Sequence, residues 1–141
     1  MNIKIADESD RESVISLVNE LQRHGGNELI KTKTQQYEKI LQSPEHRMFL
    51  IFEGPKPVGL ATFYSYPKLA GQRAVIEDFI VTEAERGKGY GSKLLEHIKQ
   101  YCKNTGIEVL NIASRNDNEK AHRFYLRNGG SFNTKLFKFS L

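Results

Sequence analysis

The chain of 141 residues lacks the features that mark several classes of protein. It has one cysteine and no tryptophan, and no apolar run approaches the ~20 residues that a membrane-spanning helix needs. A single cysteine cannot form an internal disulfide, which excludes a disulfide scaffold. The amino terminus has neither a basic and apolar leader nor a small-residue cleavage site. These gaps predict a cytoplasmic protein without a membrane partner.

The composition predicts one folded domain that binds an anion. Hydrophobic residues make up 38% and charged residues 27%, and no repeat, linker or low-complexity tract divides residues 1–141. The formal net charge is +4. A basic balance favours an anionic partner, which leaves nucleic acid, a membrane surface and a phosphorylated small molecule open.

The hydrophobic periodicity alternates between strand and helix in a mixed α/β order. Ser9 with Glu12 predicts a capping box at the first helix, and Gly25 predicts its end. A hairpin is expected at the turn "GPKP", a loop at "PKLAGQ", and a parallel βαβ unit around the third helix. The expected strands cover 2–6, 47–53, 57–66, 74–81, a buried strand at 108–113 and a last strand at 134–141. The expected helices cover 9–25, 34–43, 92–104 and 118–128.

The stretch "RGKGYG", residues 86–91, lies between an expected strand and the helix that follows it. Its glycines remove the Cβ atoms that would keep an anion away from the unpaired amides of a helix start, and Arg86 and Lys88 add positive charge. This combination predicts a pyrophosphate site. The spacing fits neither the dinucleotide fingerprint nor the P-loop. A flexible turn with incidental cations is the alternative.

Two carboxylates, Glu77 and Asp78, interrupt the apolar strand "AVIEDFIV". Regular alternation would place them on opposite faces of the sheet. A buried carboxylate without a partner has a raised pKa, which suits proton transfer. The alternative, equally compatible with the pattern, is that each pairs with a surface Arg or Lys at a sheet edge.

The expected helix at 118–128 carries Asn118, Ala121, His122 and Tyr125 on one stripe. Asn118 suits a helix cap, Tyr125 a core aromatic, and His122 a locally hydrogen-bonded side chain. Cys102 fits a small buried helix residue better than a nucleophile. No metal ligand set is predicted.

Taken together, "EDFIVTEAERGKGYGSKLL" and "NDNEKAHRFYLRNGG" resemble the two signature segments of the GNAT superfamily of N-acetyltransferases. The pattern R-x-x-G-x-G is met by Arg86, Gly89 and Gly91, and N-x-x-A-x-x-x-Y by Asn118, Ala121 and Tyr125. Within the superfamily the chain is most similar to the spermidine/spermine and thialysine acetyltransferases. The resemblance implies a mostly antiparallel central sheet with a parallel βαβ unit and helices on both faces.

The resemblance also implies acetyl-CoA as cosubstrate and a homodimer. Its pyrophosphate would lie on the backbone from Arg86 to Ser92, and its pantetheine arm beside Phe79 and Val81. Glu77 is implied as the base and Tyr125 as the acid, in direct attack of an amine on acetyl-CoA within a ternary complex. The full set of residues implied at the cofactor is Phe79, Ile80, Val81, Arg86, Gly87, Lys88, Gly89, Tyr90, Gly91, Ser92, Asn118, Ala121 and Arg127.

The acceptor is not encoded in any motif of the sequence. Glu77 and Asp78, with Glu28, Tyr64 and Tyr66, are candidate contacts to a small primary amine such as a polyamine or an amino acid. Protein or peptide amines stay open as acceptors. A non-catalytic acyl-CoA-binding module is a further alternative. Nucleic-acid binding ranks lower, because no base-stacking motif interleaves with the cations.

Overall fold

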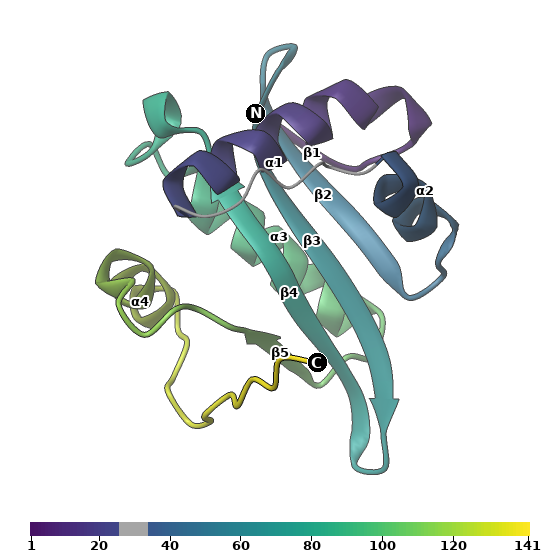
Figure 1. The fold of residues 1–141 in the computed structure, drawn as a ribbon, viewed down its shortest axis with the longest axis vertical. Coiled ribbons are helices and arrows are strands. Elements are labelled where there is room, and N and C mark those ends of the chain that lie inside the picture. The colour runs from purple at the N-terminus through teal and green to yellow at the C-terminus, as the bar shows by residue number, and fades with distance from the viewer. Residues whose placement is uncertain (26–33) are drawn as a thin grey trace. The chain divides into compact units, whose positions relative to one another are not determined.

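The computed structural model describes residues 1–25 and 34–141, with side chains described for residues 1–20 and 35–141. The chain divides into two compact units, Met1–Asn111 and Ile112–Leu141. The first unit is built around the sheet, and the second contains the last helix and the carboxyl-terminal segment (Figure 1).

The sheet has five strands in the order β1-β2-β3-β4-β5. The first four pair antiparallel with their neighbours. The helix between β4 and β5 returns the chain to the start of β4, where the Glu108 amide donates to the Gln72 carbonyl (3.1 Å), so β5 runs parallel to β4. The strands are β1 (Asn2–Ile5), β2 (His46–Glu53), β3 (Lys56–Lys68), β4 (Gly71–Val81) and β5 (Val109–Ile112).

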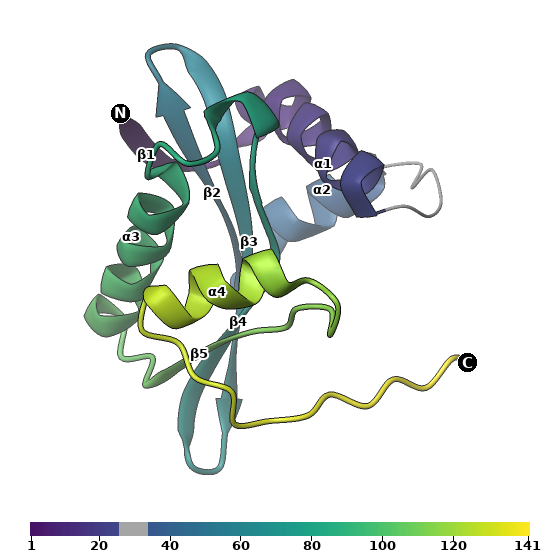
Figure 2. The ribbon, with the colours of Figure 1, turned by 90° about the vertical axis from the view of Figure 1, so that its left-hand side faces the viewer.

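Helices of the first unit cover both faces of the sheet (Figure 2). On one face α1 (Arg11–Gly25) and α2 (Thr34–Gln42) pack against the strands, and on the other face α3 (Tyr90–Asn104) does so. Two short turns of 3-10 helix, η1 (Glu8–Asp10) and η2 (Glu83–Glu85), precede α1 and α3. The predicted mixed α/β fold with a parallel βαβ unit and helices on both faces is confirmed.

Each face of the sheet has its own apolar core. The α1 and α2 face buries a cluster of Ala6, Val14, Leu17, Tyr37, Met48, Leu50, Leu60 and Ile80. On the α3 face the rings of Phe49, Phe63 and Tyr101 meet edge to face, with centroids 5.3 to 5.8 Å apart. Cys102 is buried on this face, as predicted, and burial raises the pKa of its thiol to about 11.

The start of the first helix differs from the prediction. Asp7, not Ser9, caps the turn: its carboxylate accepts a hydrogen bond from the Ser9 amide (2.9 Å), while the Asp10 carboxylate accepts one from the Asp7 amide (2.9 Å). The predicted box of Ser9 and Glu12 is wrong because η1 precedes α1, so the cap lies two residues further upstream.

The expected loop at 67–72 is also wrong. β3 continues to Lys68 and β4 begins at Gly71, so only Leu69 and Ala70 form the turn of the hairpin. Backbone pairing extends to the end of this hairpin although the side chains there no longer alternate between polar and apolar.

β5 is less buried than expected. Val109 and Asn111 are exposed because β5 is the edge strand of the sheet. In the second unit, α4 (Glu119–Arg127) ends before Gly129 as predicted, with a φ of 90° at that glycine. The last predicted strand is wrong: residues 134–141 form no strand, because no described residue forms a ladder with them.

Candidate active site

A β-bulge interrupts the pairing of β4 with β3 at Glu77. Thr62 pairs with Asp78. The next β3 residue, Phe63, pairs with Ile76, so Glu77 is the extra residue on β4. The buried Thr62 hydroxyl donates a hydrogen bond to the Asp78 carboxylate (2.6 Å) and accepts one from the Asp78 amide (2.9 Å). This double contact fixes the position of the bulge.

The two carboxylates of β4 have different environments. Glu77 is exposed, and no described residue donates a hydrogen bond to it. The expectation of a buried carboxylate is therefore wrong for Glu77. Asp78 is half-buried, and its partner is the Thr62 hydroxyl, so pairing with Arg or Lys at a sheet edge is wrong for Asp78. The prediction of opposite faces relied on regular alternation, which the bulge interrupts.

The backbone of β4 turns some of its polar groups away from β3. The Thr82 amide donates to the Val58 carbonyl (2.9 Å) at the end of the ladder. Along an antiparallel ladder, residues whose backbone groups bond to the neighbouring strand alternate with residues whose backbone groups do not. Counting back from Thr82, every second residue therefore points its amide and carbonyl toward β3. Phe79 and Val81 lie between these residues, and their amides and carbonyls therefore point to the other side of β4.

β5 does not extend along that side of β4 as far as these residues. β4 has 11 residues and β5 has 4, and β5 begins beside Gln72. β5 therefore ends before it reaches the part of β4 that holds Phe79 and Val81. An extended ligand with amide groups fits against a strand edge, because it can exchange hydrogen bonds with the strand.

The turn at 86–91 has the backbone geometry of an anion site. Gly87 and Gly89 have φ values of 80° and 87°, which side chains other than glycine rarely adopt. The Gly89 carbonyl accepts the Lys93 amide (3.1 Å) as α3 begins. The amides of residues 90–92 therefore have no acceptor within the helix and lie at the positive end of its dipole.

The space in front of this turn is open. A Cβ added at Gly87 or at Gly89 would meet no atom within 4 Å. Unpaired amides, left-handed glycines and open space together fit the pyrophosphate group that the sequence predicted.

The cations of the turn are held by neighbouring oxygens. The Arg86 Nε donates to the Val81 carbonyl (3.0 Å), which keeps the guanidinium next to the end of β4. Lys88 forms an ion pair with Glu85 (2.8 Å), and this ammonium lowers the pKa of the Glu85 carboxyl. Lys56 lies 4.0 Å from the other Glu85 oxygen. Arg86, Lys88 and Lys56 thus place three cations around the turn and Glu85.

Tyr90 anchors the start of α3 through its side chain. The buried ring packs inward, and its hydroxyl donates a hydrogen bond to the Glu53 carboxylate. That hydrogen bond is the main cause that raises the pKa of Tyr90 to about 12. Since the side chain is used for anchoring, the Tyr90 contribution to an anion site is its backbone amide.

In the second unit, α4 carries the other predicted motif. The Asn118 side chain accepts a hydrogen bond from the Ala121 amide (3.2 Å), which confirms it as a helix cap. His122 is locally hydrogen-bonded, as predicted, since its Nε2 donates to the Arg115 carbonyl (2.8 Å). Tyr125 is half-buried, and burial raises the pKa of its phenol to about 12.

The other residues predicted to contact the acceptor or the cosubstrate lie on β3 and α4 or outside the described residues. Tyr64 and Tyr66 stack near the end of β3, with ring centroids 5.5 Å apart. The Arg127 guanidinium lies 6.0 Å from the centre of the Phe124 ring. Glu28 falls outside the described residues.

Three supporting residues were not predicted from the sequence. Thr62 holds the bulge, Glu53 anchors Tyr90, and Glu20 accepts a hydrogen bond from the Glu83 amide (2.7 Å). Only Thr62 carried a signal, as a hydroxyl inside the apolar run "GLATFY". The other two contacts join residues far apart in the sequence, and no local pattern announces them.

A comparison with protein families identifies the chain. The model of the acetyltransferase (GNAT) family matches residues 13–130. The chain therefore belongs to the GNAT family, and the resemblance drawn from its two motifs is confirmed. It is an acetyltransferase that uses acetyl-CoA as cosubstrate.

The chain is also similar to individual proteins. The uncharacterized N-acetyltransferase YhdJ of Bacillus subtilis is 26% identical over 113 residues, which cover 77% of this chain and 78% of that protein. The thialysine N-epsilon-acetyltransferase of Bos taurus is 31% identical over 74 residues, 52% of this chain and 44% of that one. The crystal structure of an aminoglycoside acetyltransferase from an uncultured soil metagenomic sample has a TM-score of 0.86 at 20% identity, covering 99% and 94% of the two chains.

The described residues contain neither a candidate membrane span nor a candidate metal centre. None of the described helices has both the length and the apolar character to cross a membrane. Within the same residues, no group of three or more His, Cys, Asp or Glu side chains could hold a metal ion.

Gly89→Ala is expected to raise the Kd for acetyl-CoA about 5- to 30-fold, because alanine lets the free turn leave the left-handed conformation and binding must restore it at a cost of about 1–2 kcal/mol. Isothermal titration calorimetry measures this Kd. Gly106→Ala is the matched control, because Gly106 has a φ of 74°, also has open space around it, and lies just beyond the far end of α3. Both variants should lose similar stability, whereas only Gly89→Ala should lose affinity. An equal Kd for the two variants would contradict the role of the turn.

Proposed function

We propose that this acetyltransferase moves an acetyl group from acetyl-CoA to a primary amine of a small molecule, of the polyamine or amino-acid type. The observation that carries the proposal is the junction of β4 and α3, where the end of β4 leads into a glycine turn whose amides have no acceptor within the helix. The partial match to a thialysine acetyltransferase supports an amine acceptor. A panel of amines tested for acetylation identifies the acceptor, and peptides in the same panel test the runner-up, a protein or peptide amine.

In this proposal the backbone of 79–92 holds the cosubstrate. The outward groups of Phe79 and Val81 pair with the amides of the pantetheine arm, and Ile80 between them anchors the strand in the core. The amides from Arg86 to Ser92, with Lys88, hold the pyrophosphate. Asn118, Ala121 and Arg127 are further proposed contacts. Bound acetyl-CoA supplies the thioester carbonyl that the amine attacks, and an amide near Phe79 stabilises the charge that develops on its oxygen.

Glu77 is proposed as the base. A free primary amine has a pKa near ~10.4, so only about one molecule in a thousand is neutral near pH 7.4. The attacking amine must lose a proton, and the exposed Glu77 carboxylate accepts it directly or through water. Asp78, Tyr64 and Glu28 are proposed to contact the acceptor. The reaction proceeds by direct attack in a ternary complex, without an acetylated enzyme.

Tyr125 is proposed to stabilise the departing thiolate by donating a hydrogen bond. Full proton transfer from a phenol with a pKa of about 12 to a thiolate near ~8.5 is uphill by about 5 kcal/mol. The Tyr125 proton therefore stays on the phenol, and solvent completes the protonation of the thiol.

We also propose that the chain is a single domain, that it forms a homodimer and that it resides in the cytoplasm. The family model supports one domain, because it spans parts of both compact units. A lone cysteine fits a reducing compartment.

Small-molecule acceptors are favoured over nucleic acid, since Lys88, Arg115 and Arg123 are each paired with a carboxylate.

The carboxyl-terminal segment supports the homodimer. The segment 131–141 is irregular, yet its five large apolar side chains are exposed, with Phe139 83% accessible. Its alternating apolar residues have the pattern of a strand, and a strand needs a neighbour. In the proposed dimer, residues 134–141 of each copy add to a sheet edge of the other, and the two-fold exchange buries both segments. The side chains concerned are Phe132, Leu136, Phe137, Phe139 and Leu141.

Tyr125→Phe is expected to lower turnover about 10- to 100-fold, because it removes a hydrogen bond to a charged leaving group. The Kd for acetyl-CoA should stay nearly unchanged. Release of CoA thiol with the identified acceptor measures the rate. Tyr101→Phe is the matched control, since that ring packs in the α3-face core. Normal turnover of Tyr125→Phe would remove Tyr125 from the mechanism.

Glu77→Gln is expected to lower turnover about 100-fold or more and to change the acidic limb of the pH-rate profile, because an amide does not accept the proton. Initial rates between pH 5 and pH 9 measure the effect. Glu96→Gln is the control, since Glu96 is an exposed carboxylate that pairs with Lys99 on α3. The role of Glu77 as base fails if its variant keeps the wild-type rate and profile.

Phe137→Ser with Phe139→Ser is expected to convert the dimer to a monomer of 16.2 kDa. Light scattering coupled to gel filtration measures the mass. Lys135→Ser with Lys138→Ser changes the polar positions of the same segment and should leave the dimer intact. A wild-type protein that elutes as a monomer, or a Phe variant that remains dimeric, would contradict the proposed exchange.

A further inference from the structure

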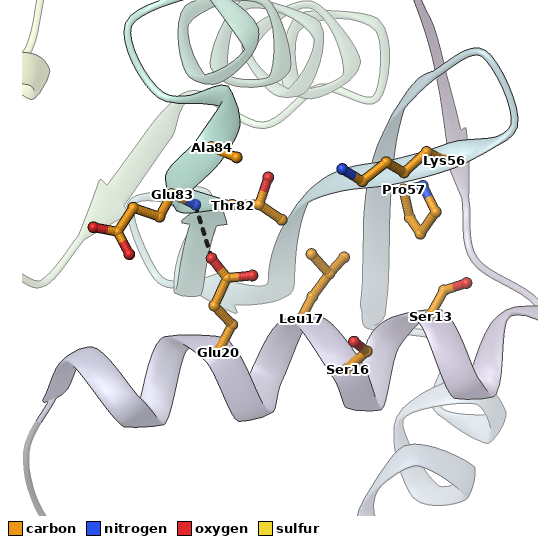
Figure 3. A pocket seen from close by; sticks show the side chains of 9 residues that line it. All are labelled: Ser13, Ser16, Leu17, Glu20, Lys56, Pro57, Thr82, Glu83 and Ala84. Carbon is orange, nitrogen blue, oxygen red and sulfur yellow. Dashed lines mark hydrogen bonds between the residues drawn. The ribbon is translucent and has the colours of Figure 1, made fainter.

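A pocket lies in the first unit between α1, the start of β3 and η2 (Figure 3). Its volume of about 630 Å³ is in the range of sites for small molecules. Leu17 and Pro57 give it an apolar floor, and its other lining groups are polar or small. The lining residues are Ser13, Ser16, Leu17, Glu20, Lys56, Pro57, Thr82, Glu83 and Ala84.

One end of the pocket presents a hydroxyl and an ammonium. The Thr82 Oγ1 is buried, and no described residue hydrogen-bonds to it. A buried hydroxyl without a partner is unusual in folded proteins. The Lys56 ammonium points toward Thr82 across the pocket (Figure 3). Its nearest carboxylate, Glu85, is 4.0 Å away and is held more closely by Lys88. These two groups together suit a carboxylate.

The pocket also presents a carboxylate, from α1. Glu20 uses Oε1 to accept the Glu83 amide (2.7 Å), which joins α1 to η2. In Figure 3 the other Glu20 oxygen lies toward Leu17, whereas the Glu83 carboxylate points away from the remaining side chains. An ammonium group suits the free oxygen of Glu20, and the Leu17 and Pro57 floor suits a short apolar stem.

We propose that this pocket binds a free amino acid as an effector. The carboxylate of the amino acid contacts Lys56 and the Thr82 hydroxyl, and its ammonium contacts Glu20. The Lys56 ammonium and the Glu20 carboxylate together select a zwitterion over a simple acid or a simple amine.

The pocket is separate from the proposed site of acetyl transfer. Thr82 lies three residues beyond Phe79, beside which the thioester is proposed to lie, roughly 10 Å along an extended chain. An amino acid in the pocket is therefore bound without being acetylated. Thr82 and Glu83 lie just before the turn at 86–91, so a ligand that ties α1 to η2 also steadies the segment that leads into the turn. Binding of the amino acid is expected to tighten binding of acetyl-CoA. By reciprocity, binding of acetyl-CoA is expected to tighten binding of the amino acid.

Calorimetric titration tests the pocket without any requirement for turnover. Single L-amino acids at millimolar concentration are titrated into the wild-type protein, with acetate and methylamine as probes that carry one charge each. At least one amino acid should bind, more tightly than either probe. Thr82→Val and Lys56→Gln should each weaken that binding about tenfold or more. Lys99→Gln, a lysine on α3, should leave it unchanged. With the amino acid present, the Kd for acetyl-CoA should fall about fivefold.

Three outcomes would overturn the proposal. The first is that no amino acid binds to the wild-type protein. The second is that binding is the same in Thr82→Val, Lys56→Gln and the wild type. The third is that mass spectrometry finds the bound amino acid acetylated and that both variants abolish this product, since the pocket would then be the acceptor site. None of these outcomes depends on the role of Glu77 or Tyr125, so the proposed mechanism is tested separately.

Discussion

The hydrogen bond from the Thr82 amide to the Val58 carbonyl ends the β3–β4 ladder and sets the orientation of the backbone groups of β4. Because hydrogen-bonding partners alternate in an antiparallel ladder, this bond decides that Phe79 and Val81 turn their backbone groups away from β3. It also fixes where the chain leaves the sheet to form η2 and the glycine turn. The Thr62 and Asp78 contact fixes the other end of the same stretch, at the bulge. The proposed base, the strand edge and the anion site therefore share one short scaffold.

The cations near the turn are held in place by neighbouring oxygens and still offer positive charge to an anion. Glu85 holds Lys88 and the Val81 carbonyl holds Arg86, so both cations have defined places beside the open backbone amides. A phosphate group meets positive charge and amides that need little rearrangement, which lowers the entropy lost on binding. The apolar faces of the sheet supply the rigidity, because Ile80 in the middle of this stretch is part of the core.

The sequence predicted the elements whose side chains repeat regularly. The helical stripe that includes Leu94, Leu95 and Ile98, and the glycine turn before it, were found from spacing alone. The helix cap was misplaced because a 3-10 turn shifts it to Asp7, which the capping-box pattern does not reveal. The bulge at Glu77 depends on the register with β3, so the exposure of this carboxylate could not be predicted. The contact between Glu20 and the Glu83 amide joins residues 63 positions apart and has no local signal. Residues 134–141 alternate like a strand, but periodicity does not show whether a neighbouring strand exists.

Release of CoA thiol from acetyl-CoA in the presence of a panel of small primary amines shows directly whether the protein acetylates a small amine. A reaction without acceptor and a reaction with peptide amines serve as references, and mass spectrometry identifies the acetylated product. We expect thiol release above both references, with one small amine carrying the acetyl group. Release with peptides alone, and none with any small amine, would contradict it.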